Sequence, residues 1–266
     1  MNYVRETLTS LEEIIAAENI SRTSVKRSAT ATEFFAVILS ALKGSKDVAQ
    51  IMALLEILVT VLPKSSSSVV RSQFDSLVTK LLNFLKQAVD IGNAKFVRLC
   101  VECLGSFLCV QEVSDGFWGN ILALQSINIL LGFIDDARVR LRHIAKSHLT
   151  KLLSLHHMHK GNTIRSYISD FCIEVMKSCS RSDYRRSYFV VLFLENIGPF
   201  LINPQKTCFF ALQLQECGQP VLTAAVLRMI DSFYQHPQLT LTANEVMETI
   251  KPVSYTHLTL PTNREV

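Results

Sequence analysis

The chain has 266 residues, of which 48% are hydrophobic and 19% charged, with only nine glycines and seven prolines. This composition excludes a disordered chain and favours an ordered, helix-rich one, which at this length buries roughly 70–75% of its unfolded surface. The formal net charge of +4 is mildly basic, so it favours an acidic partner without approaching a histone-like excess.

Residues 1–29 are expected to form a partial helix and a polar linker. Residues 1–17 carry a short helical pattern in Leu8, Leu11 and Ile15, which we interpret as the second half of a helix pair. Residues 18–28 are polar, basic and without period, which is typical of a linker or surface loop.

From Thr30 onward, amphipathic segments follow one another in pairs joined by short polar turns. The pairs begin at positions 30, 69, 117, 163, 204 and 243, which lie 39 to 48 residues apart. This period indicates HEAT or armadillo units, whose helix pairs must stack on neighbours to bury their apolar faces. We therefore expect an all-α solenoid of about five to six antiparallel helix pairs over residues 30–251, as a piece of a longer solenoid. The expected helices are 30–43 with 47–62, 69–89 with 94–109, 117–131 with 136–155, 163–179 with 183–197, and 204–216 with 220–236.

The stretch from Asp135 to Lys160 is the most informative of these segments. Its order of a turn, an aspartate and then Val139-Arg140 is similar to the start of the second helix of a HEAT repeat. Apolar residues three and four apart predict one buried face, and Arg138, Arg142 and Lys146, spaced by fours, predict a basic stripe on another.

Residues 252–266 abandon the helical period and form an irregular tail. This tail is similar to the adapter-derived ends of some library-assembled coding sequences, so we expect it to be non-native. An uninterrupted exon encoding the tail would contradict this expectation.

Three stretches carry a resemblance to a known family: residues 28–42, Val97-Arg98 with residues 103–108, and residues 220–227. Their order resembles the amino-terminal HEAT-repeat region of the ribosomal RNA processing protein 12 family, from about Thr30 to Ile250. The resemblance implies a nucleolar helical scaffold that associates with pre-ribosomal particles, rRNA and nuclear transport or assembly factors. It also implies a role in pre-rRNA processing and in small-subunit maturation and export.

The basic residues of these helices are candidate contacts for RNA or another acidic partner. Second helices of stacked pairs line one side of a superhelix, so their cations can form a strip for phosphates, and tyrosines such as Tyr184 and Tyr188 can stack on bases. The alternative is that these cations form solvated faces that keep the solenoid soluble. The candidates are Arg138, Arg140, Arg142, Lys146, Lys151, Arg165, Arg181, Arg185 and Arg186, with Lys160 between them.

Two further clusters suggest metal ligands but fit other roles better. The run His156-His157-Met158-His159 has no cysteine or acidic partner nearby and is more typical of a helix end where imidazoles meet free carbonyls. Cys100-x-x-Cys103 lacks the second pair that a zinc site needs, and on a helix both thiols share a face with Leu104 and Phe107. We therefore expect core packing there, with no metal and no cofactor.

Phosphate-binding, zinc-protease and nucleophile-elbow motifs are absent from the sequence, which argues against an enzyme and a small-molecule substrate. Seven cysteines inside apolar runs are typical of reduced core thiols, and no apolar run reaches the roughly 18 residues that span a bilayer. We expect a non-catalytic, soluble scaffold in the nucleus and nucleolus, without a membrane partner. The alternative is an adaptor or nuclear-transport-receptor-like solenoid that binds protein without RNA contact.

Overall fold

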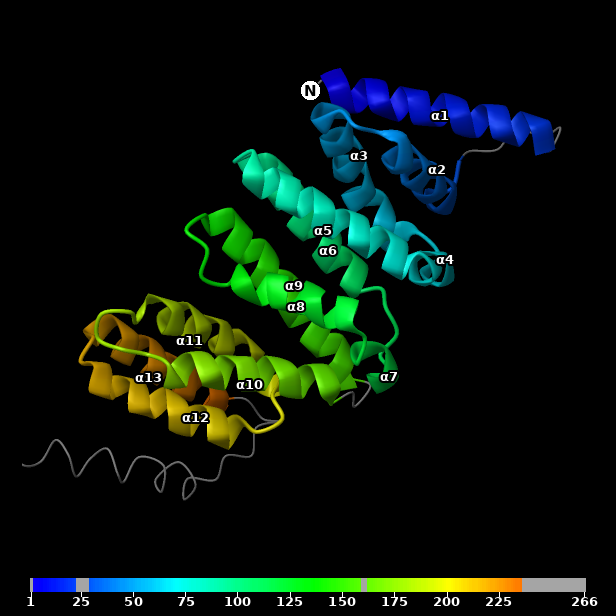
Figure 1. The fold of residues 1–266 in the computed structure, drawn as a ribbon. Helices are drawn as coiled ribbons and strands as arrows, with labels where there is room; N and C mark the ends of the chain where they lie inside the picture. The colour runs from blue at the N-terminus through cyan, green and yellow to red at the C-terminus, as the bar shows by residue number, and fades with distance from the viewer. Residues whose placement is uncertain (1, 23–28, 159–161, 236–266) are drawn as a thin grey trace, which may run out of the picture. The chain divides into compact units, whose positions relative to one another are not determined.

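The computed structural model describes residues 2–22, 29–158 and 162–235. Within these ranges every regular element is a helix and no strand occurs, which confirms the all-α prediction (Figure 1). The sixth pair expected near Ala243 and the tail at 252–266 lie outside the described residues. No helix of the described ranges is both long enough and apolar enough to cross a bilayer.

The chain divides into two compact units, residues 1–152 and 153–266, with the division inside α9. The elements of the first unit are α1 (Asn2–Arg22), α2 (Ala31–Gly44), α3 (Val48–Val61), η1 (Leu62–Lys64), α4 (Ser67–Ser72), α5 (Phe74–Asp90), α6 (Ala94–Leu108), α7 (Asp115–Trp118), α8 (Ile121–Gly132) and most of α9 (Val139–Met158). Those of the second unit are α10 (Thr163–Lys177), α11 (Arg185–Ile197), η2 (Gly198–Phe200), α12 (Pro204–Gln213), η3 (Leu214–Cys217) and α13 (Pro220–Gln235).

Helices in the first unit pack as serial pairs. The helix pairs α2–α3 and α5–α6 pack internally, and they stack on each other through α3 and α6. The stack continues because α8 contacts both α5 and α6. Helix α1 packs on α2 and α3, and it buries Leu11 and Ile15 there (Figure 1).

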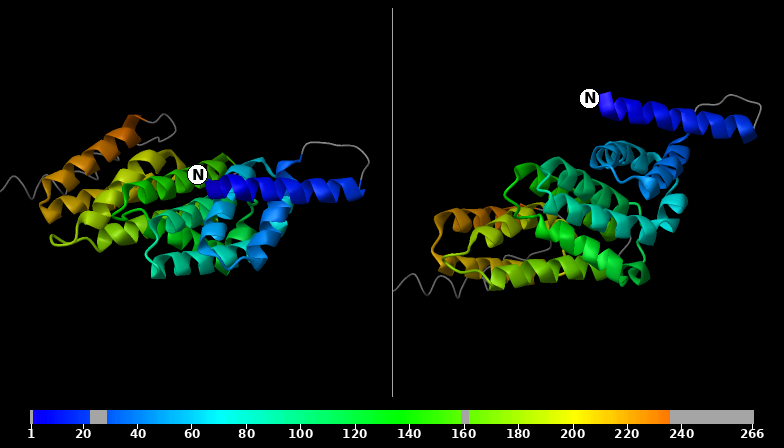
Figure 2. Two further views of the ribbon diagram at one scale, coloured as in Figure 1. Left: turned by 90° about the horizontal axis from the view of Figure 1, so that it is seen from above. Right: turned by 45° about the horizontal axis from the view of Figure 1, so that its top comes forward.

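The second unit repeats the same arrangement. Helix α10 packs on α11 within one pair and α12 on α13 within the next. Between the pairs, first helix contacts first helix, α10 on α12, and second contacts second, α11 on α13 (Figure 2). This ladder of contacts is the stacking expected from the period of about forty residues.

Local sequence signals set the starts of several helices. Thr30 and Glu33 form a capping box, in which the Glu33 carboxylate accepts the Thr30 backbone N–H at 2.8 Å and the Thr30 hydroxyl accepts that of Glu33 at 3.3 Å. Asp47, Asn93 and Asn120 cap α3, α6 and α8 by accepting backbone N–H groups through their side chains.

In two of the helix pairs, the first helix is interrupted where the sequence predicted an unbroken one. Between α4 and α5, the backbone of Gln73 is non-helical, which places Phe74 in an aromatic cluster 5.8 Å from the Phe107 ring and 4.8 Å from the Phe117 ring. Between α7 and α8, Gly119 ends the short helix, and Asn120 caps the next one.

Two other helix boundaries also differ from the prediction. Helix α1 runs to Arg22, into the expected linker, because Ala16-Ala17-Glu18 are strong helix formers. Helix α9 begins at Val139 rather than Asp136, because residues 136–138 form a turn that is held by side chains.

Candidate nucleic-acid interface

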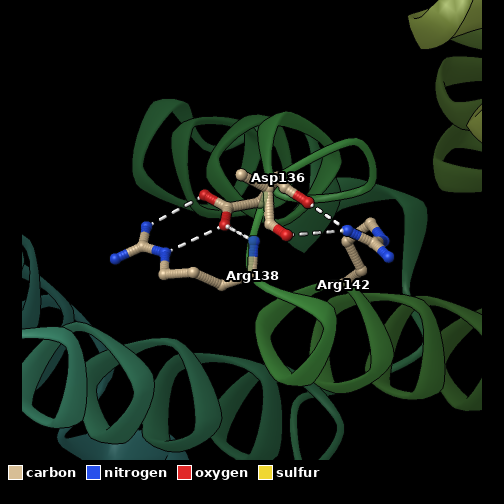
Figure 3. Close-up of polar contacts among 4 residues, drawn as sticks. Asp136, Arg138 and Arg142 are labelled. Carbon is tan, nitrogen blue, oxygen red and sulfur yellow. Dashed lines mark hydrogen bonds and ion pairs between the residues drawn. The ribbon is translucent and has the colours of Figure 1, made fainter.

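The turn that leads into α9 uses two of the predicted basic residues for structure (Figure 3). The Arg138 guanidinium donates from Nε and Nη2 to the two carboxylate oxygens of Asp136, at 2.9 Å each. The same carboxylate accepts the Arg138 backbone N–H at 2.8 Å. Arg142 donates from Nη1 to the carbonyl oxygens of Asp136 and Ala137, at 2.6 and 3.1 Å. These bonds fix the α8–α9 turn.

The pKa shifts of Asp136 and Arg138 agree with this hydrogen bonding. The hydrogen bond from the Arg138 side chain is the main reason that the pKa of Asp136 is lowered. The same pair raises the pKa of Arg138. A carboxylate and a guanidinium joined in this way form a bidentate charge-assisted pair, which leaves Arg138 less of its charge for a phosphate.

The remaining basic residues of α9 differ in accessibility. Lys146 is half-buried and is engaged in an interaction within the chain. Arg140 and Lys151 are exposed. The predicted stripe is therefore incomplete, because Arg138 precedes α9 and both Arg142 and Lys146 are engaged within the chain. The side chains most available to a partner are Arg140 and Lys151.

Arg165, at the start of α10, is also tied into the fold. Its Nε donates to the carbonyl oxygen of Phe200 at 2.8 Å, and its Nη2 to that of Leu201 at 3.3 Å. Burial lowers its pKa. The guanidinium thus satisfies two carbonyl groups of the segment between α11 and α12, and this role is structural.

The other three predicted cations of the second unit, Arg181, Arg185 and Arg186, are exposed. The Arg185 guanidinium lies 5.7 Å from the centroid of the Phe189 ring, and that of Arg186 lies 5.5 Å from the Phe171 ring. Cations held over aromatic faces keep their charge toward solvent while their position is restricted. We define Arg181, Arg185 and Arg186 as the α11 cation cluster.

Tyr184 and Tyr188, the candidates for stacking on bases, are half-buried, and the Tyr188 ring contacts Phe189 edge-on at 5.4 Å. Sequence reasoning missed Lys177, whose Nζ lies 5.0 Å from the Phe210 ring centroid and 2.8 Å from Glu174. The i,i+3 spacing of Glu174 and Lys177 was the available signal. Its partner Phe210 lies on another helix and had no signal in sequence.

The described residues form a cavity in each of the two units. A polar one of about 420 Å³ lies between the α10–α11 and α12–α13 turns and is lined by Lys177, Arg181 and Glu216 among others. An apolar groove of about 510 Å³ lies between α5 and α8, lined by Leu82, Leu85, Lys86, Val89, Asp90, Gln125, Asn128 and Ile129.

The histidine run lies at the C-terminal end of α9, as predicted from the sequence. His156 is buried, and the His157 ring lies 5.7 Å from that of Phe200, whereas His159 and Lys160 lie outside the described residues. No group of three metal-ligating side chains occurs in the part of the chain that the structure describes.

Cys100 and Cys103, both on α6, are buried in the hydrophobic core, as expected. The Cys103 thiol donates to the carbonyl oxygen of Leu55 at 3.5 Å. Burial raises the pKa of Cys100 to about 12, so this thiol is inert at neutral pH.

Serially stacked helix pairs define a HEAT/armadillo-type repeat fold. Over residues 5–241 the chain matches the family model described as "RRP12-like, N-terminal HEAT repeats". The chain belongs to this family, as the resemblance predicted.

Curated relatives agree with this assignment. The chain is 22% identical over 243 residues to a human RRP12-like protein, with 86% of this chain and 18% of that protein covered. It is 22% identical over 205 residues to the RRP12-like protein of Gallus gallus, covering 74% and 15%. The chain therefore spans less than a fifth of the length of these relatives.

The chain is also similar to solved structures of engineered proteins. One is an engineered protein at 12% identity and a TM-score of 0.45, with 84% of this chain and 87% of that chain covered. Another is a designed armadillo repeat protein in complex with a peptide (KR)4, at 9% identity and a TM-score of 0.45, covering 87% and 98%.

Proposed function

We propose that this chain is a non-catalytic helical-repeat scaffold of ribosome biogenesis, which associates with pre-ribosomal particles in the nucleolus during pre-rRNA processing and small-subunit maturation and export. Membership of the RRP12-like family is the observation that carries the proposal. The partners we propose are pre-ribosomal ribonucleoprotein, rRNA and nuclear transport or assembly factors.

Exposed cations give the proposed scaffold a means of contacting RNA. The α11 cation cluster places three guanidinium groups within six residues of chain, and two of them lie over aromatic rings. In the first unit, Arg140 and Lys151 are the exposed cations of α9. Cations of this kind bind phosphate backbones without sequence preference, and the binding weakens as salt rises.

Charge reversal tests this contact directly. The triple variant R181E/R185E/R186E should weaken binding to a precursor rRNA fragment and lower the slope of log K against log salt by ~0.7 for each lost phosphate contact on single-stranded RNA. The matched control is K43E/K46E/K64E, which makes the same change in net charge at exposed lysines of the first unit. Equal effects of both variants, or none from either, would contradict a specific role for the α11 cation cluster.

The apolar groove between α5 and α8 favours a second candidate, a protein-binding adaptor without RNA contact. Val89, at the groove, is 57% exposed and so adds apolar surface to it. Helix-in-groove binding uses apolar surfaces of this kind. An adaptor would lose its partners on substitution of Val89 and Ile129 to Asp, and it would not lose them on reversal of the α11 cation cluster.

A further inference from the structure

Two cysteine sulfurs lie against each other in the second unit. Cys179 follows α10 in the α10–α11 turn, and Cys217 is the last residue of η3, in the α12–α13 turn. Their Sγ atoms are 3.3 Å apart, although 38 residues separate them in sequence. Disulfide formation requires the sulfurs to approach by about 1.2 Å more.

Both sulfurs can be reached from solvent. Cys179 and Cys217 are half-buried, and both line the polar cavity of about 420 Å³ between the two turns. In contrast, Cys100, Cys172 and Cys208 are buried among apolar side chains. A small polar oxidant therefore has access to the Cys179–Cys217 pair but not to the core thiols.

The two turns are already held together around this pair. The side-chain amide of Gln219 donates to the carbonyl oxygen of Arg181 at 3.4 Å. Gly218, directly after Cys217, has a φ of 64°, which lets the chain turn sharply beside the sulfur. The Arg181 guanidinium lies close to Gly218, so a positive charge stands near the pair.

Hydrogen bonding distinguishes the two thiols. The Cys217 S–H donates to the Cys179 sulfur. Burial, and then this hydrogen bond, raises the pKa of Cys217 to about 11. Cys217 therefore keeps its proton at neutral pH, and we assign Cys179, which accepts this hydrogen bond, as the sulfur that reacts first with the oxidant.

We propose that Cys179 and Cys217 are an oxidative modification site, which forms a reversible disulfide when a peroxide enters the cavity. The Cys179 sulfur attacks one peroxide oxygen and the O–O bond breaks; the departing hydroxide takes up the Cys179 thiol proton and leaves as water, so that Cys179 becomes a sulfenic acid. The Cys217 sulfur then attacks the Cys179 sulfur, the S–O bond breaks, and water leaves with the proton of Cys217. In total two thiols and one hydrogen peroxide give one disulfide and two waters.

The disulfide would crosslink adjacent helix pairs, α10–α11 and α12–α13. Because it closes a long loop, it restricts the unfolded chain and should raise the unfolding temperature of the oxidised chain by roughly 5 °C or more. A reducing thiol would reverse the change.

The test uses the full chain, reduced, treated with equimolar hydrogen peroxide, alkylated with N-ethylmaleimide and digested. Mass spectrometry should find a Cys179–Cys217 crosslinked peptide that is lost on reduction. C217S should leave a dimedone-reactive sulfenic acid at Cys179, and C109S, which removes another half-buried thiol, should keep the crosslink. Wild-type Cys179 and Cys217 that remain separately alkylated after peroxide treatment would overturn the proposal, and this result does not depend on any variant folding.

Discussion

Gly105 of α6 lies directly against the imidazole of His148 on α9. A Cβ atom placed on Gly105 would be 2.4 Å from Cγ of His148 and 2.7 Å from its Cβ, which is closer than side-chain contacts allow. The Cys109 thiol of the same helix region donates to the His148 carbonyl oxygen at 3.7 Å. The absence of a side chain at Gly105 is therefore what lets these two helices approach.

Gly105→Ala should destabilise the first unit by about 1–3 kcal/mol, because the added methyl group forces the helices apart. The readout is denaturant unfolding followed by fluorescence of Trp118, which is buried and is the chain's single tryptophan. The matched control is Gly132→Ala in α8, where an added Cβ meets nothing within 4 Å. That control should be neutral or stabilising by up to about 1 kcal/mol. Equal stability of the two variants would contradict the close approach.

His148 should make the first unit lose stability in mild acid. Burial, with a smaller effect from Lys151, lowers the folded pKa of His148 from 6.5 to about 4. Between these values the unfolded chain binds a proton that the folded chain does not, so the free energy of unfolding falls as pH drops. From pH 7 to pH 5 the loss should be about 1–2 kcal/mol.

The variant His148→Gln removes the titrating group and should flatten this part of the pH profile. Unfolding at several pH values, followed through Trp118, measures the slope in both proteins. A wild-type free energy that stays constant between pH 7 and pH 5, or a variant with the same slope, would show that His148 is not the group responsible.

Arg165→Gln should destabilise the second unit by about 1–3 kcal/mol, because the carbonyl oxygens of Phe200 and Leu201 lose charge-assisted donors. Hydrogen exchange at the backbone amides of α10 and α11 reports the loss. Arg181→Gln, an exposed arginine in the same unit, is the control and should change stability by less than about 0.5 kcal/mol. If both variants behave alike, Arg165 has no structural role.

Asp136→Ala should cost about 0.5–2 kcal/mol, since it removes the acceptor for the Arg138 backbone N–H and guanidinium. Asp136→Asn keeps one acceptor oxygen and should recover part of this loss. Because the pKa of Asp136 is lowered in the folded chain, its contribution is present above the ordinary carboxyl pKa and fades as pH falls below it. Unfolding followed through Trp118 compares the three proteins, and an Asn variant as unstable as the Ala variant would count against the acceptor role of the Asp136 carboxylate.

Much of the fold could be predicted from the sequence. The period of about forty residues placed α2 with α3, α5 with α6, and each later pair to within a few residues, because apolar spacing and cap residues are local signals. The breaks at Gln73 and Gly119 were missed. Gln73 is not a breaker by itself, and it is the packing of Phe74 on Phe107, from another helix, that accompanies the break.

The candidate site could be predicted only in part, because spacing places a cation on a helix face but does not show what it touches. Arg142 donates to carbonyls of the turn before α9, and Arg165 donates to carbonyls 35 and 36 residues further along the chain, whereas Arg185 and Arg186 remain exposed. The contact of Lys177 with Phe210 joins different helices, so no short-range pattern could show it.

Affinity capture of the tagged chain from nuclear extract, with and without RNase, tests the proposed scaffold role most directly. We predict that precursor rRNA and small-subunit assembly proteins are recovered, that RNase reduces their recovery, and that R181E/R185E/R186E reduces it while K43E/K46E/K64E does not. Recovery of RNase-resistant partners without any pre-ribosomal component would contradict this account and favour the protein-binding adaptor.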